Sequence, residues 1–143
     1  MDLRNPISVA RARRLFAPRV QDVACLAADA VGDLICIRGN RINGKWRVQR
    51  ADPYDLARMP AVGVLLSKTT PTVGVALLLG AAQLWGNLFH PGAVCFVGAD
   101  GRPRHGPPPV GPGGWALVQA IGTAAAEDTL LLACGCGMIR RRG

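Results

Sequence analysis

The chain has 143 residues, of which 50% are hydrophobic and only 5% aromatic, and its net charge is +8. This length suits one domain with a core of small aliphatic side chains, and it is too short for two sizeable cores. Eighteen glycines and eleven prolines favour many short strands joined by turns, without the low complexity of a disordered chain.

The positive charge is concentrated at the two ends. Residues 1–20 contain five arginines and one aspartate, and residues 140–142 are three arginines, whereas residues 21–139 carry nine basic and eight acidic side chains. We therefore divide the chain into a basic N-terminal arm (1–20), a single β-domain (21–139) and a basic C-terminal tail (140–143). Basic ends bind acidic surfaces of nucleic acid, lipid or protein, or stay solvated without a function. We expect the arm to be extended and to contact a partner through Arg4, Arg11, Arg13, Arg14, Phe16 and Arg19.

The first half of the β-domain predicts strands and one helical turn. Residues 21–37 read as strand, turn and strand, and Asn43-Gly44 is a strong hairpin signal before a strand at 46–50. Asp52 followed by Pro53 has the pattern of a helix start, with the carboxylate as N-cap. This pattern predicts a short helix over 52–59 that ends at Pro60.

The central feature is a hairpin of two apolar runs, 61–66 and 73–79, around a polar turn at 67–72. Both runs are β-branched and contain glycines, which favours strands, and the turn is too long for a tight primed turn. The uncharged stretch continues to Ala99, and this surplus of apolar surface predicts an interface between subunits. Its expected residues are Val62, Val64, Val75, Leu77 and Leu79.

The second half of the domain predicts three more strands. These lie at 93–97, 115–121 and 129–133, and they are separated by a proline-rich loop over 102–114 and a turn over 122–128. Together, these expected strands predict an all-β fold. We expect a small antiparallel β-barrel or sandwich of β-tulip-like form with one short helical turn. We expect no membrane span, because the longest apolar window, 73–89, is broken by glycines and polar residues.

The sequence does not predict a catalytic or metal site. The two histidines, His90 and His105, lie beside proline or glycine in loops, and Ser67 lacks the context of an activated nucleophile. Most acidic residues stand where turns and caps use them, namely Asp29, Asp33, Asp52, Asp100, Glu127 and Asp128. No phosphate-binding loop is present in the sequence. We therefore expect a non-enzymatic protein without a cofactor.

Five cysteines occur, Cys25, Cys36, Cys95, Cys134 and Cys136, in a chain with no apolar leader at its start. Buried free thiols explain them most simply, although Cys134 or Cys136 could pair with a neighbour or another subunit after cell lysis. Their spacing is a weak case for a metal site.

A nucleic-acid surface has one candidate within the domain. Lys45 and Arg47 flank Trp46, with Arg38, Arg41 and Arg50 nearby. Single-strand binding uses basic and aromatic residues interleaved on one sheet face. A solvent-facing hairpin explains the same residues, and we prefer that explanation, so nucleic acid is not the expected partner.

The order of features between Val23 and Ala133 resembles a family of small phage virion proteins. The segments that carry the resemblance are VACLAADAVGDLICI, RVQRADPYDLARMPAVGVLLSK, VGVALLLG, LFHPGAVCFVGADG and WALVQAIGTAAAEDTLLLA. The family includes head decoration (cement) proteins, head fibres and tail-fibre knobs, and its modules are generally trimeric and lie on the virion surface. The five cysteines and the strongly basic ends depart from its pattern.

The resemblance implies a structural role on the capsid. Because the chain has no long fibre shaft, we expect a homotrimeric decoration protein whose arm docks on the major capsid protein. A host-attachment knob that presents the loop at 98–114 is the alternative, and a nucleic-acid-binding barrel is a third.

Overall fold

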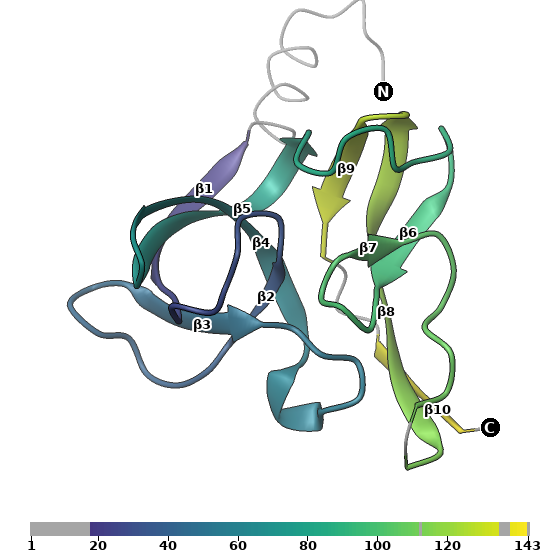
Figure 1. Cartoon of the computed structure of the whole chain (residues 1–143), viewed down its shortest axis with the longest axis horizontal. Helices are drawn as coiled ribbons and strands as arrows, with labels where there is room; N and C mark the ends of the chain where they lie inside the picture. The colour runs from purple at the N-terminus through teal and green to yellow at the C-terminus, as the bar shows by residue number, and fades with distance from the viewer. Residues whose placement is uncertain (1–17, 112, 135–137, 143) are drawn as a thin grey trace, which may run out of the picture.

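Five strands form a closed β-barrel in the computed structural model, which describes residues 18–111, 113–134 and 138–142 (Figure 1). Their order around the barrel is β1, β3, β2, β4 and β5, and β1 pairs with β5 to complete the ring. The β1–β3 pair is parallel and the other pairs are antiparallel. The strands are β1 Arg19–Ala24, β2 Leu34–Ile37, β3 Trp46–Arg50, β4 Ala61–Thr70 and β5 Val73–Ala82.

A second sheet continues from the end of β5. Residues 79–82 of β5 pair with β9, β9 pairs with β8, and β8 pairs with β6, which leads to β7. β10 lies beside the first half of β8. These strands are β6 Val94–Val97, β7 Pro103–Arg104, β8 Trp115–Ala126, β9 Thr129–Ala133 and β10 Met138–Arg142. The result is a β-barrel with an added sheet beside it, which confirms the predicted all-β fold class (Figure 1).

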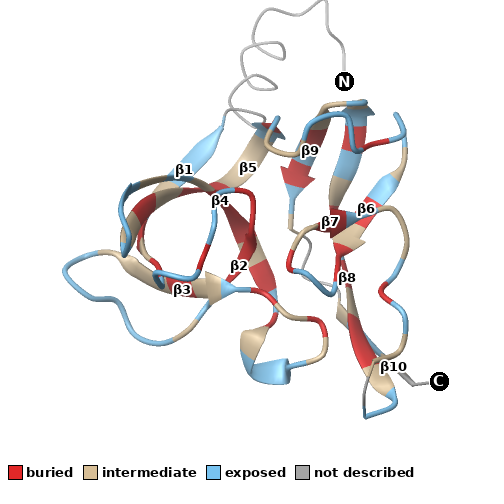
Figure 2. Ribbon diagram, in the orientation of Figure 1, coloured by how far each residue is buried: buried red, intermediate tan, exposed pale blue. Residues whose placement is uncertain are grey.

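The core has two parts, one inside the barrel and one between the barrel and the second sheet. The barrel interior is small and contains Val23, Cys25, Ile35, Val48, Leu65 and Ala76. The larger part joins residues of β2, β4 and β5 to residues of β6, β8 and β9, among them Leu34, Val64, Leu77, Cys95, Ile121, Leu130 and Leu132. Strand β2 and the first half of β4 are therefore covered on both faces, and Figure 2 shows buried stretches there.

Gln119 joins the two layers through the backbone of Ala61. This glutamine is 1% exposed, and its Oε1 accepts a hydrogen bond from the Ala61 N–H at 2.8 Å while its Nε2 donates to the Ala61 carbonyl at 2.9 Å. Two further hydrogen bonds connect distant segments of the chain: Trp85 Nε1 donates to the Gly32 carbonyl, and the Leu117 N–H donates to the Pro53 carbonyl. Buried backbone groups need such partners, because water cannot replace them there.

The central hairpin differs from its prediction at the turn. β4 runs to Thr70 and β5 starts at Val73, so the connection is the dipeptide Pro71-Thr72 rather than a loop over 67–72. Two shifts of register, at Leu65/Ser67 and at Lys68/Thr70, absorb the extra residues of β4 as bulges. The polar residues 67–70 are therefore part of strand β4, whereas the prediction from polarity ended the strand at residue 66.

Several other boundaries also move. The short helix is a single 3-10 turn, Leu56–Arg58, and its N-cap is Asp55, whose Oδ1 accepts from the Ala57 N–H. Asp52 instead accepts from the Tyr54 N–H in the preceding turn. β8 continues to Ala126, so the expected turn at 122–128 shrinks to Glu127-Asp128.

The expected ends of the domain change as well. Arg19 and Val20, assigned to the arm from the sequence, begin β1, and Arg140–Arg142, assigned to a tail, form most of β10. The Asn43-Gly44 turn is confirmed, with φ of 51° and 74° between the bridged residues Ile42 and Lys45. In the part of the chain that the structure describes, no helix has the length and apolar character to cross a membrane.

We predict that Gln119→Leu destabilises the protein by about 2–4 kcal/mol, because each buried backbone group left without a partner costs roughly 1–3 kcal/mol. Urea unfolding followed by tryptophan fluorescence measures this. Gln83→Leu is the matched control, because the Gln83 amide bonds Thr129 at the exposed surface. Equal stability of the two variants would contradict the role of Gln119.

Candidate functional site

An exposed row of uncharged side chains crosses four strands of the second sheet. Ala81 of β5 lies opposite Leu131 of β9, Leu131 lies opposite Thr123 of β8, and Thr123 lies opposite Val94 of β6. Residues directly opposite in antiparallel strands share a face. All four are exposed, Leu131 by 49% and Val94 by 47% of their surface. We call this row and its neighbours Leu79, Phe96, Ala120 and Ala133 the apolar sheet face.

The sequence explains why one side of this sheet is buried and the other is apolar but exposed. In β9, Leu130 and Leu132 are in the core, whereas Leu131 and Ala133 are exposed between and after them. A half-buried strand of a monomer ordinarily alternates apolar with polar residues. Here both sets are apolar, which is the pattern of a strand that is covered on both faces.

Charged residues lie at the margins of the apolar sheet face. Arg104 of β7 pairs with Phe96 at one edge, and β10 brings Ile139, 70% exposed, beside Val118 at the other. Arg141 follows on β10, and its Nη2 donates to the Pro108 carbonyl. An apolar centre with a polar rim is the usual anatomy of a protein interface.

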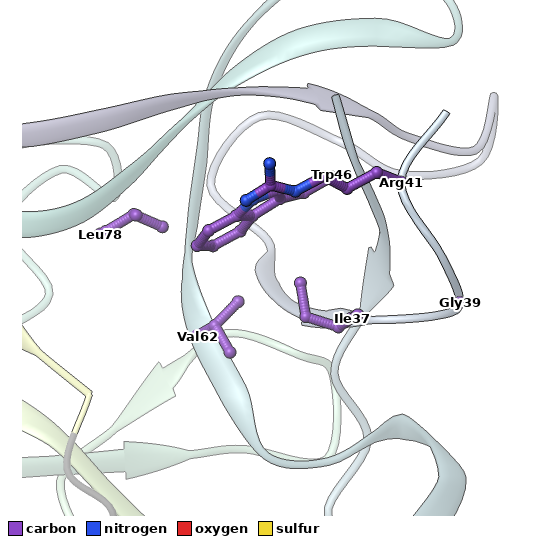
Figure 3. Close-up of a pocket in the computed structure, with 6 residues that line it drawn as sticks. All are labelled: Ile37, Gly39, Arg41, Trp46, Val62 and Leu78. Carbon is purple, nitrogen blue, oxygen red and sulfur yellow. The ribbon is translucent and has the colours of Figure 1, made fainter. Parts of the chain in front are cut away.

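A second candidate surface is a pocket at one end of the barrel, which we call the barrel mouth. It has a volume of about 370 Å³, and its lining residues come from β2, β3, β4, β5 and the β2–β3 loop. Figure 3 shows the Trp46 ring and the side chains of Ile37, Val62 and Leu78 around the opening, with Arg41 along it. The lining residues are Ile37, Gly39, Arg41, Trp46, Val62 and Leu78.

The structure separates the interface residues that the sequence predicted. Val62 lines the barrel mouth, Val75 is half-buried on the barrel wall opposite Asp22, and Leu79 belongs to the apolar sheet face. Val64 and Leu77 are 0% and 3% exposed in the core between the layers. Their assignment to an interface is therefore wrong, because side chains enclosed within the subunit cannot touch another one.

The residues predicted for the arm fall in two groups. Arg4, Arg11, Arg13, Arg14 and Phe16 lie outside the described residues. Arg19 is exposed at the start of β1, opposite Leu79 of β5. The arm therefore joins the domain beside the apolar sheet face.

The side chains weighed for catalysis lie apart. Ser67 is in β4 opposite Val75, whereas His90 and His105 stack on each other in loops of the second sheet, with ring centroids 4.6 Å apart. His105 Nε2 accepts from the His90 N–H at 3.1 Å. Across 18–111, 113–134 and 138–142 no group of three or more metal-ligating side chains occurs.

Two acidic side chains serve as buried turn acceptors. Asp29, 5% exposed, accepts from the Leu26 and Arg50 N–H groups. Asp33, 4% exposed, accepts from the Ala30 N–H and lies 3.6 Å from Arg102 Nη2. The turn chemistry predicted for these residues is confirmed.

Four of the cysteines are free thiols held in the fold. Cys25, Cys36 and Cys95 are buried, and burial raises the pKa of each thiol above its ordinary value. Burial raises the pKa of Cys134 to about 12. Cys136 lies outside the described residues. The thiolate is the reactive form, so these four side chains are poor nucleophiles and metal ligands in the folded protein.

The apolar sheet face could have been found from the sequence by one signal. Residues 116–126 and 129–133 contain no charged side chain, so both faces of each strand had to be uncharged. The pairing of these strands with the end of β5 could not be derived, because it depends on tertiary contacts. Comparison with protein-family models, curated proteins and solved structures found no match to this chain.

We predict that iodoacetamide at pH 8 leaves Cys25, Cys36, Cys95 and Cys134 unmodified in the folded protein. A raised pKa keeps a thiol protonated until the pH approaches that value, so labelling should increase as the pH rises. Mass spectrometry of native and guanidinium-unfolded samples measures this, with the unfolded sample as control. Rapid labelling of native Cys134 would contradict the prediction.

Proposed function

We propose that this chain is a structural, non-enzymatic virion protein that assembles as a homotrimer and decorates the capsid surface by docking on the major capsid protein. The observation that carries the proposal is the apolar sheet face, which is exposed, uncharged and bordered by cationic residues. The resemblance of the sequence to small phage virion proteins supplies the class of assembly.

Burial of this face between copies of the chain is the simplest source of stability for the oligomer. Apolar surface contributes roughly 25 cal/mol per Å² removed from water, so burial of Leu131 and Val94 alone contributes about 1–3 kcal/mol per subunit. Wide exposed apolar patches on a single subunit mark interaction sites. In a closed three-membered ring each copy buries this face against a different surface of its neighbour.

The position of the arm supports a docking role beside that interface. Pro18 packs on Gly80, where an added Cβ would lie 3.3 Å from the Pro18 Cα, and Arg19 lies opposite Leu79. The arm therefore joins the domain at the border of the apolar sheet face, and we propose that it crosses a subunit boundary from there. Its arginines suit carboxylates on a capsid surface, through charge-assisted hydrogen bonds.

We predict that Leu131→Glu disrupts the trimer, because it places a charge at the centre of an apolar contact. Light scattering on purified protein at micromolar concentration should report a trimer for the parent and mainly monomer for the variant, with at least a tenfold loss of association. Leu56→Glu is the matched control, since Leu56 is 64% exposed on the 3-10 turn away from this face. A parent protein that is monomeric under these conditions would exclude the trimer.

We also predict that deletion of residues 1–17 abolishes binding to capsid particles and leaves the trimer intact. The deletion stops at 17 because β1 begins at Arg19, and loss of β1 would open the barrel. Co-sedimentation of the truncated protein with undecorated particles measures binding, with light scattering as the control for assembly. Attachment to the particle that survives the deletion, together with loss of host adsorption, would favour the fibre-knob alternative.

A further inference from the structure

The barrel mouth is an apolar socket that nothing else in the described structure fills. Trp46 and Leu78 pack against the interior cluster of the barrel and form the floor of the socket, and Ile37, 42% exposed, stands at its wall. Val62 completes the wall at the point where β4 shifts register against β2. The assembly that we propose does not use this surface, because none of the residues that line the socket belongs to the apolar sheet face.

The hairpin that forms the socket wall is basic. Residues 38–50 contain Arg38, Arg41, Lys45, Arg47 and Arg50 and no acidic side chain. Arg41 lines the socket, and the Arg47 guanidinium lies beside Gly39, 3.6 Å from the position of an added Cβ. Among the described residues Arg41, Lys45 and Arg47 form no ion pair, so their charge is open to a partner.

Charge argues against the chain itself as the occupant. The N-terminal arm carries apolar side chains that could fill a socket, but residues 1–20 also carry five arginines against one aspartate. Bringing this segment, from the same copy or another, onto the basic hairpin places like charges together, which costs free energy. An acidic segment, in contrast, is attracted by the positive charges of the hairpin, which lowers the free energy of binding.

The shape and charge of the socket favour a protein segment over other anions. A nucleic-acid strand needs successive aromatic platforms, and Trp46 is the single aromatic side chain in strands β1 to β5. A small amphipathic anion needs one cation, whereas the same hairpin also carries Arg38, Lys45 and Arg47, which line a second depression. Several carboxylates in a row match this arrangement.

We propose that the barrel mouth binds an extended acidic segment of a partner protein, with one large apolar side chain of that segment in the socket. The anchor packs on Trp46, Leu78 and Val62, and carboxylates on either side of it pair with Arg41 and Arg47. This inference is independent of the capsid proposal, because it uses neither the arm nor the apolar sheet face.

Fluorescence anisotropy with labelled peptides on the full-length protein tests the proposal. The probes are EDELFEDE, its anchor-less form EDEGSEDE, its charge-reversed form KRKLFKRK, and a single-stranded thymidine oligonucleotide. We expect saturable binding of EDELFEDE, weakened at least tenfold by removal of the anchor and weakened by salt. No binding of EDELFEDE at millimolar concentration would overturn the proposal, and so would tighter binding of the oligonucleotide or of KRKLFKRK.

Two substitutions place the binding site. Arg41→Glu should weaken EDELFEDE at least tenfold, whereas Arg140→Glu, which makes the same change of charge at an exposed arginine over the Trp115 ring of the second sheet, should leave it unchanged. Ile37→Asn, which adds no charge, should weaken the anchor-bearing peptide and leave the weak binding of EDEGSEDE unaltered, so it separates the apolar contact in the socket from the electrostatic attraction of the basic hairpin. Circular dichroism controls for folding. Equal effects of Arg41→Glu and Arg140→Glu, or peptide binding that requires deletion of residues 1–17, would overturn the assignment.

Discussion

The packing of the second sheet on the barrel depends on one buried amide. Gln119 stands in an apolar strand and presents a donor and an acceptor to the backbone of Ala61, as a neighbouring strand would. Ala61 begins β4, whose other edge is paired with β2, so this amide completes the pairing of the strand at its first residue. The amide also favours one register between the layers, because a shift by one residue would break both of its hydrogen bonds to Ala61.

Local chemistry was enough to predict much of the fold. The Asn43-Gly44 turn, the acceptor roles of Asp29 and Asp33 and the strands around them depend on residues close in sequence, and each was found. The polar residues Ser67 and Lys68 misled the prediction, because bulges keep them in β4. The Lys68 ammonium donates to the Asp29 carbonyl at 2.7 Å, so its polarity serves a contact between distant segments.

The predicted site was recovered less well, for the same reason. The sequence predicts an apolar surplus in the central hairpin, but the closed barrel and the second sheet cover both faces of the first half of β4, and Val64 and Leu77 are in the core. The exposed surplus is found later in the chain, on β8 and β9. To predict an exposed apolar surface on β8 and β9, one must know which strands pair. The residue pattern of a single strand does not determine its pairing with a strand that is distant in the sequence.

The two ladders of β1 have a mechanical consequence. β1 is hydrogen-bonded on one edge to β5 and on the other to β3, and the arm enters at its first residue. The hydrogen bonds of an antiparallel ladder run perpendicular to the strand. A pull on the arm along the axis of β1 therefore loads these bonds in shear, so that many must yield together, rather than opening them one after another. The point where the arm joins β1 is therefore expected to resist a pulling force.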